Sequence, residues 1–151
     1  MRSESVSGFY EPPPGFASPF RDRLLHPHWD LIQRALGRPV PGILRELYGE
    51  PDAVLRGHFR VRPPGGGETR WLDLFFPMDE EALRPYGRVL PAGAIAFADN
   101  EHGDPYFFVP DATGYGDGPV YLQVQEEGKE LTELVAPSLS EFLGWQRDST
   151  Y

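Results

Sequence analysis

Apolar residues recur at helical spacing near the start of the chain. Trp29, Ile32 and Leu36 share one face of a helix, and the glycine that follows them ends the run. Pro41 then suits the first turn of a second helix, whose apolar face lies within residues 43–48. The pattern therefore predicts two short helices joined by a tight turn.

The middle of the chain changes to segments typical of strands, which alternate in polarity or are continuously apolar and are bounded by Gly, Pro, Asn and Asp. Residues 77–87, with acids near their start, predict a short helix between two of these segments. Residues 130–135 fit either a strand or a helix, and we favour a strand. The other expected strands lie within residues 58–62, 69–76, 93–99, 105–109 and 119–125.

A capping signature marks the last element. Ser138 and Glu141 have the spacing of a capping box, and Leu139, Phe142 and Leu143 form the buried stripe of the helix that follows. Helices come first along the chain, then consecutive short strands, then a helix. This order favours an α+β fold with an N-terminal helix pair, a largely antiparallel sheet of five to six strands and a C-terminal capping helix.

Residues 1–24 have a different character, that of a proline-rich arm. Pro12–Pro14 favour polyproline II, but the four aromatic residues of this stretch are more than a free tail needs. We therefore expect the arm to pack partly against a single α+β domain at residues 25–151.

Composition narrows the class of protein. The chain has no cysteine, which excludes disulfides, thiolate metal sites and cysteine nucleophiles. No apolar run is long enough to span a bilayer, and the N-terminus lacks the apolar segment of a secretory signal. We therefore expect a cytoplasmic protein without a membrane partner.

The net charge of −9 is unevenly placed. Between Asp99 and Glu141 ten acids stand against Lys129 alone, whereas the rest of the chain balances thirteen acids with thirteen arginines. Such an acidic segment repels nucleic acid phosphates. It attracts a basic protein surface and accelerates the encounter with it. Charge alone leaves open the alternative that the acids only keep the protein soluble.

The polar loop that starts at Asp99 raises the question of a calcium site. In an EF-hand loop with Asp99 first, the glycine position falls at Asp104 and the bidentate glutamate at Pro110, so the spacing fails. Gly103 instead permits a positive φ, and Asn100 and Asp104 suit turn hydrogen bonds. We therefore predict a structural turn between two strands.

Other catalytic or metal-binding patterns are weaker. His26, His28, His58 and His102 could supply zinc ligands together with an acid, but nothing in the sequence fixes their mutual geometry. There is no Gly-x-Ser-x-Gly elbow, and the glycine-rich residues 63–68 lack the Lys-Ser/Thr of a phosphate-binding loop. We therefore expect no catalytic residue, no cofactor and no metal. A metal-dependent hydrolase that uses His58 or His102 is the remote alternative.

Four pieces of the chain follow one another in a familiar order. They are a helix pair with a proline before its second helix, a strand with a Gly-Asp turn and an aromatic strand, a further strand, and a closing Ser-x-x-Glu-Phe-Leu helix. They occupy residues 32–51, 90–111, 118–128 and 134–145. Together they resemble the SUKH superfamily, the family of yeast cell-wall-assembly-regulator-like proteins and bacterial toxin-immunity proteins.

The resemblance implies a single α+β domain without enzymatic activity. Many bacterial members of the superfamily resemble immunity proteins that bind and neutralise a toxin, often a nuclease, and others resemble regulatory or scaffolding proteins. The proline-rich arm and the insertion-like residues 62–70 depart from the family pattern, and either could change the partner.

Resemblance and charge together lead to our functional hypothesis. We expect an immunity protein that binds a basic toxin domain through an acidic surface, whose carboxylates mimic the phosphates that a nuclease expects and whose aromatic residues anchor the partner. The alternative is a regulator or scaffold of the same fold, with an endogenous partner and little salt dependence. The candidate partner-binding residues are Asp99, Glu101, Asp104, Asp111, Tyr115 and Asp117.

Overall fold

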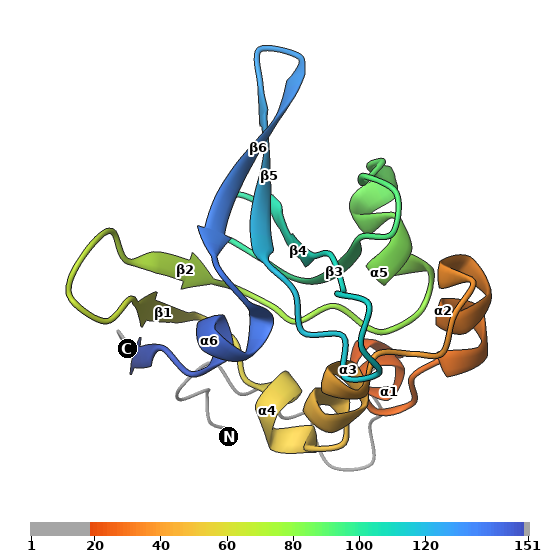
Figure 1. Cartoon of the computed structure of the whole chain (residues 1–151). Helices are drawn as coiled ribbons and strands as arrows, with labels where there is room; N and C mark the ends of the chain where they lie inside the picture. The colour runs from red at the N-terminus through yellow and green to blue at the C-terminus, as the bar shows by residue number, and fades with distance from the viewer. Residues whose placement is uncertain (1–18, 150–151) are drawn as a thin grey trace.

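The computed structural model describes residues 19–149, with the first four helices gathered on one side of the molecule and the sheets on the other (Figure 1). The helices are α1 (Pro19–Leu25), α2 (Trp29–Leu36), α3 (Gly42–Tyr48), α4 (Pro51–Leu55), α5 (Glu80–Leu83) and α6 (Leu139–Leu143), with a 3-10 turn η2 (Pro85–Gly87). The strands are β1 (Phe59–Arg62), β2 (Arg70–Leu72), β3 (Ile95–Asp99), β4 (Pro105–Phe108), β5 (Val120–Glu126), β6 (Lys129–Ala136) and β7 (Gln146–Ser149). The predicted α+β class is confirmed.

Helices α2 and α3 are the pair that the apolar spacing predicts. α2 buries Ile32 and ends at Gly37, which adopts the left-handed conformation with a φ of 69°. α3 buries four apolar residues, Tyr48 among them. The Tyr48 hydroxyl donates a hydrogen bond of 2.6 Å to the carbonyl of Phe76, which ties α3 to the chain beside the four-stranded sheet.

The strands divide between two antiparallel sheets, whereas we expected one. The order is β2-β1-β7 in the first and β3-β4-β5-β6 in the second. The reason lies in the segment predicted as one strand at residues 69–76. Its first half pairs with β1, and its second half crosses to β3, where Phe75 bridges Ala98 and the Phe76 N–H donates to the Phe97 carbonyl at 2.8 Å.

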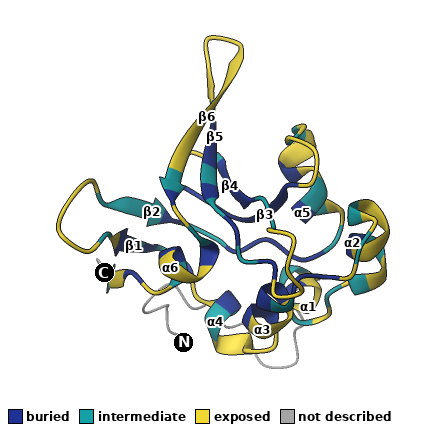
Figure 2. Ribbon diagram, viewed as in Figure 1, coloured by how far each residue is buried: buried dark blue, intermediate teal, exposed yellow. Residues whose placement is uncertain are grey.

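The core lies between the helices and the sheets, and its aromatic part fixes α6 (Figure 2). The rings of Phe142 and Tyr106 have centroids 5.3 Å apart, and so do those of Phe142 and Trp145. The Ser138 hydroxyl accepts a hydrogen bond of 3.1 Å from the Glu141 N–H, which confirms the predicted cap. Aromatic burial and capping together hold this short helix against the sheet.

A long hairpin formed by β5 and β6 extends beyond the body of the molecule (Figure 1), and its outer half is exposed (Figure 2). Glu127 and Gly128 form its turn with φ values of 51° and 78°. Two successive positive φ values are typical of the tight turn that matches the twist of a hairpin. The strand interpretation of residues 130–135 is confirmed.

Three elements were not expected from the pattern: β7, α1 and the short helix α4, which begins at Pro51 and buries Val54. β7 pairs with β1 although its four residues are polar or charged. α1 begins at Pro19, inside the stretch that we predicted as an arm, and buries Leu24. The rest of the predicted arm, residues 1–18, lies outside the described residues, as do residues 150–151.

Candidate protein-binding site

The fold divides the six candidate residues between two places. Three of them lie at the end of β3 and in the turn that follows it, and three lie in the loop between β4 and β5. Their contacts show which of them are available to a partner.

Asp99 lies below the surface and is 3% exposed. Its carboxylate accepts hydrogen bonds from the Leu74 N–H at 3.0 Å and from the Tyr86 hydroxyl at 2.5 Å. Burial raises the pKa of Asp99 to about 6, although both of these bonds act to lower it. Asp99 therefore does not belong to a binding surface. It holds Tyr86 and the crossing segment in place, which corrects our assignment.

The turn after β3 is built as predicted. The Asn100 side-chain oxygen accepts hydrogen bonds from the N–H groups of His102 and Asp104, both at 2.9 Å. Gly103 has a φ of 79° and donates to the Asn100 carbonyl at 3.1 Å. Glu101 is exposed, and its Oε2 lies 3.6 Å from Nε2 of the adjacent His102.

One arginine neutralises two of the acids near this turn. Arg88, only 14% exposed, places Nη1 3.2 Å from the Asp104 carboxylate and Nη2 3.1 Å from the Glu130 carboxylate. Glu133, also on β6, pairs with Arg70. Asp104, Glu130 and Glu133 are therefore neutralised within the chain, whereas Glu101, Glu126 and Glu127 form no ion pair with a Lys or Arg side chain of the described residues.

The loop at residues 109–119 is fixed to α3 by its main chain. The N–H groups of Gly42 and Ile43 at the start of α3 donate to the carbonyls of Gly114 and Tyr115, each at 2.9 Å. These bonds satisfy helix N–H groups that have no partner within the helix. They also set the side chain of Tyr115 beside α3.

The same loop caps α6. The carbonyl of Gly118 accepts from the Leu139 N–H at 2.9 Å, and the Asp117 carboxylate accepts from the Ser140 N–H at 3.0 Å and from the Ser140 hydroxyl. A carboxylate is favourable beside the first turn of a helix. Asp117 is half-buried, and its main role is therefore to cap α6.

Asp111 shapes the start of the loop and stays exposed. Its Oδ1 accepts hydrogen bonds from the Thr113 hydroxyl at 2.6 Å and from the Thr113 N–H at 2.9 Å. These two bonds lower the pKa of Asp111. Its carboxylate is therefore charged over the physiological pH range.

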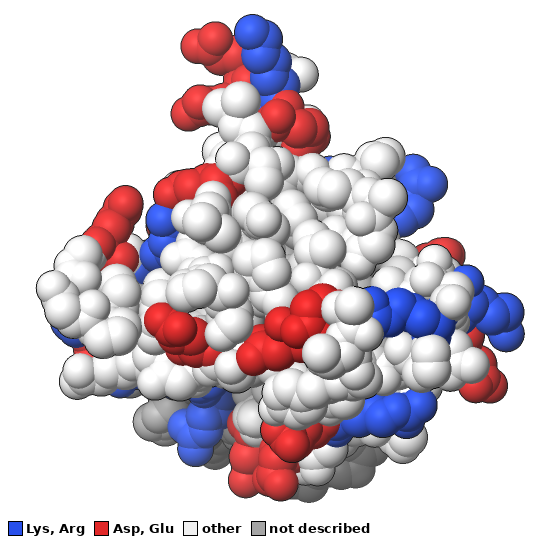
Figure 3. Space-filling view, in the orientation of Figure 1, with Lys and Arg blue, Asp and Glu red and all other residues white. Residues whose placement is uncertain are grey.

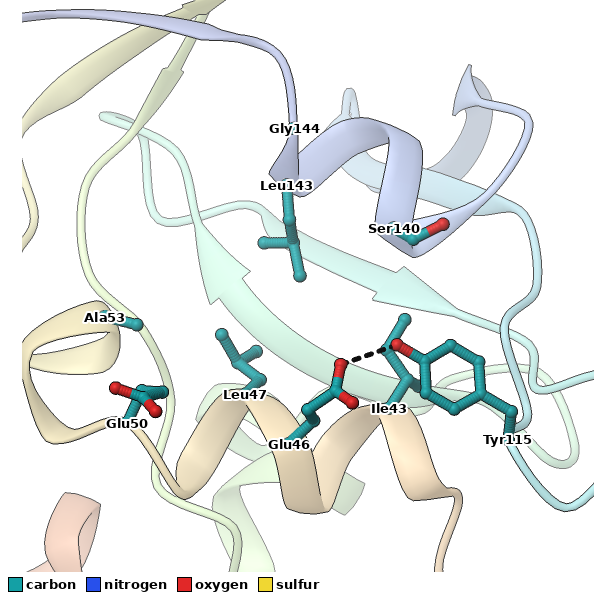
Figure 4. A pocket seen from close by; sticks show the side chains of 9 residues that line it. All are labelled: Ile43, Glu46, Leu47, Glu50, Ala53, Tyr115, Ser140, Leu143 and Gly144. Carbon is teal, nitrogen blue, oxygen red and sulfur yellow. Dashed lines mark hydrogen bonds between the residues drawn. The ribbon is translucent and has the colours of Figure 1, made fainter.

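An open groove of about 380 Å³ lies between α3, α4 and α6, beside this loop (Figure 4). We call it the α3–α6 groove and define it by three apolar residues and three polar ones, Ile43, Leu47, Leu143, Glu46, Glu50 and Tyr115. Tyr115 is 43% exposed, and its hydroxyl donates to Glu46 Oε1 at 2.7 Å. This bond to a carboxylate raises the pKa of Tyr115.

The acids around this groove differ from Asp104, Glu130 and Glu133 in having no basic partner at ion-pair distance. Within residues 19–149, no Lys, Arg or His side chain lies within ion-pair distance of Glu46, Glu50, Asp111, Asp117 or Glu141. Figure 3 shows acidic side chains across this face, over α6, the loop and the α3–α4 region. The structure therefore gathers carboxylates without an ion pair around an apolar depression. Among them, Asp111 is affected by Arg38, which donates to the Thr113 carbonyl at 2.9 Å and, after the bonds from Thr113, helps to lower the pKa of Asp111.

Sequence reasoning missed the two glutamates of the groove. Glu46 and Glu50 lie in the part of the chain where acids and arginines balance in number, so they did not stand out. The position of Glu46 on the polar side of the second predicted helix marks it as exposed, but its contact with Tyr115, 69 residues later, requires the fold.

The described residues offer no site for an ion. Within residues 19–149, no group of three or more His, Asp or Glu side chains is arranged to hold a metal. His58 lies next to Asp73, with 2.5 Å between Nδ1 and Oδ1. In the same part of the chain, no helix is long and apolar enough to cross a membrane.

Comparison with known proteins identifies the family. No curated protein and no solved structure matches the chain at a significant level. The model of the SMI1/KNR4 family (SUKH-1) matches residues 28–145, a stretch that runs from the residue before α2 to the end of the aromatic cluster at Trp145. Because the match covers most of the chain, this protein belongs to the SMI1/KNR4 family (SUKH-1).

Proposed function

We propose that this protein is a non-enzymatic binding protein of the cytoplasm that neutralises a basic toxin domain by covering its surface. Family membership supports a role in binding, and the uncompensated carboxylates around the α3–α6 groove support a basic partner. Of the residues expected from the sequence, Asp111 and Tyr115 are exposed on this face. Asp117 contributes charge while it caps α6.

The observation that carries the proposal is the contrast in charge compensation. Asp104, Glu130 and Glu133 have arginine partners, whereas the acids around the groove have none in the described chain. Unpaired surface carboxylates attract a cationic protein at long range and favour it over a neutral or acidic one. Glu101 is exposed on the β3–β4 turn, where it lines a separate hollow with Arg70 and Glu133, and it does not belong to this set.

The proposal can be tested on the natural partner. The tagged protein is used to capture partners from the cells that encode it, and the dissociation constant of each purified pair is measured over a range of salt. We expect a basic partner whose affinity falls about tenfold between about 50 and 500 mM salt. We also expect its toxic activity to be lost in the complex. A partner with little salt dependence and no toxicity would instead favour a regulator or scaffold.

A further inference from the structure

We propose that the α3–α6 groove receives a partner segment in which one apolar side chain is flanked by arginine or lysine. This inference rests on the proposed function and specifies its partner. The apolar side chain enters the groove between α3 and α6, and the cationic groups bind Glu46 and Glu50 at its edge.

The interior of the groove is apolar and already ordered. Leu47 and Leu143 face each other from α3 and α6 (Figure 4), and Ile43 lies on the same face of α3. A volume of about 380 Å³ is at the small end of the range of ligand pockets. That size suits a few side chains of a protein segment, and the burial of one apolar side chain contributes affinity there.

The edge of the groove carries two carboxylates, of which Glu46 is held in position. Glu46 Oε1 accepts the Tyr115 hydroxyl, while Oε2 accepts no hydrogen bond within the described chain (Figure 4). Glu50 is exposed beside α4 and has no basic partner in residues 19–149. A carboxylate that is fixed before binding loses less entropy when a guanidinium or ammonium group reaches it.

The rest of the acidic surface does not combine these features. The hairpin presents exposed Leu131 and Leu134, but the neighbouring Glu130 and Glu133 are paired with arginines of the same chain. Glu126 and Glu127 at the tip of the hairpin also form no ion pair in the described chain, but they lie on an exposed two-stranded ribbon, whereas the groove adds an apolar hollow that can enclose a side chain. This charge complementarity selects an apolar residue with basic neighbours as the occupant.

The test uses three short synthetic peptides with Arg-Leu-Arg, Arg-Ser-Arg and Glu-Leu-Glu cores. Each is titrated into the full-length, ¹⁵N-labelled protein at low salt, and amide chemical shifts are followed. We expect the Arg-Leu-Arg peptide to shift residues of α3, α4, α6 and Tyr115 in a saturable manner. We expect at least about threefold weaker binding of the Arg-Ser-Arg peptide and no binding of the Glu-Leu-Glu peptide.

Two double variants separate the groove from general electrostatic attraction. Glu46→Gln with Glu50→Gln removes the two charges at the groove, and Glu126→Gln with Glu127→Gln removes the same number at the exposed end of the hairpin. The first pair should weaken the binding of the Arg-Leu-Arg peptide at least about fivefold. The second pair should change the affinity of this peptide less than about twofold.

Several results would overturn the proposal. They are the absence of saturable shifts, shifts spread equally over the hairpin, equal affinity for the Arg-Leu-Arg and Arg-Ser-Arg peptides, and equal effects of the two double variants. A natural partner whose binding depends on salt, but which binds the wild type and the Glu46/Glu50 variant equally well, overturns the role of the groove and leaves the proposed function intact. A natural partner without salt dependence overturns the proposed function itself.

Discussion

The β5–β6 hairpin and the α3–α6 groove both carry glutamates, yet they present different electrostatic surfaces. On the hairpin, Arg88 and Arg70 bind the carboxylates of Glu130 and Glu133. At the groove, Glu46 and Glu50 have only a tyrosine hydroxyl and solvent as partners within the described chain. A count of acids along the sequence therefore misjudges where a cation would bind, because pairing in three dimensions decides which charges remain.

The largest expected effect concerns the loop that holds the groove together. A Cβ on Gly118 would lie 1.8 Å from the carbonyl oxygen of Val109, so Gly118→Ala forces the two ends of the loop apart. We expect a loss of about 3 kcal/mol in the free energy of unfolding, measured by urea denaturation.

Gly114→Ala is the matched control in the same loop. A Cβ at Gly114 meets no atom within 4 Å, and its φ is not positive. We expect a change below about 0.5 kcal/mol. Equal destabilisation by the two substitutions would contradict the role of the close contact at Gly118.

The next prediction concerns the arginine that neutralises two acids near the β3–β4 turn. Arg88→Met leaves Asp104, itself only 13% exposed, and Glu130 without their cation. We expect a loss of about 2 kcal/mol in the free energy of unfolding. We also expect the Arg-Leu-Arg peptide to produce new shifts in the turn and in the hairpin.

Arg84→Met provides the comparison for this substitution. Arg84 is exposed, and no side-chain hydrogen bond or ion pair involves it in the described chain. The variant should keep wild-type stability and the wild-type pattern of peptide shifts. New shifts in the hairpin of the Arg84 variant would show that total charge, not local pairing, governs binding.

A third prediction concerns the buried acid. The folded-state pKa of Asp99, about 6, lies above the ordinary 3.8, so folding favours the protonated form. The stabilising contribution of Asp99 is therefore complete below about pH 4 and is lost as the pH rises through about 6. Urea denaturation of Asp99→Asn and wild type should show the difference in stability move by about 2 kcal/mol in favour of the variant between pH 4 and pH 7.5. An unchanged difference would refute the raised pKa.

The smallest effect is expected at the groove itself. Glu46→Gln with Glu50→Gln removes exposed carboxylates that have no ion pair in the described chain, so thermal unfolding should show a stability within about 0.5 kcal/mol of wild type. A larger loss would mean that these residues serve the fold, and would weaken the case for binding.

Local periodicity was sufficient to predict much of the fold. The apolar faces of α2 and α3 and the Ser138 cap of α6 depend on neighbours within a few residues, and the structure has them where the sequence places them. β7 shows the limit. Its residues have no apolar alternation, and it is a strand because β1 offers hydrogen-bonding partners at residues 59–62.

The candidate site was less accessible to sequence reasoning. Asp99 follows four buried residues of β3. The apolar run of this strand does not reveal that the Tyr86 hydroxyl, 13 residues earlier, donates to the Asp99 carboxylate. Arg88 lies 42 residues from Glu130, and Glu46 lies 69 from Tyr115. Such pairings decide which charges are available, and they arise only when distant segments meet.

The way in which residues 109–119 hold α3 has a consequence for the evolution of this surface. The main-chain carbonyls of Gly114 and Tyr115 accept the hydrogen bonds that hold α3. Every amino acid has such a carbonyl. Substitution at Tyr115 therefore changes the side chain that a partner meets and keeps the main-chain bonds to α3, whereas Asp111 also shapes the loop through its bonds to Thr113. New binding preferences can therefore evolve through exposed side chains such as Tyr115 while the main-chain bonds that hold α3 are kept.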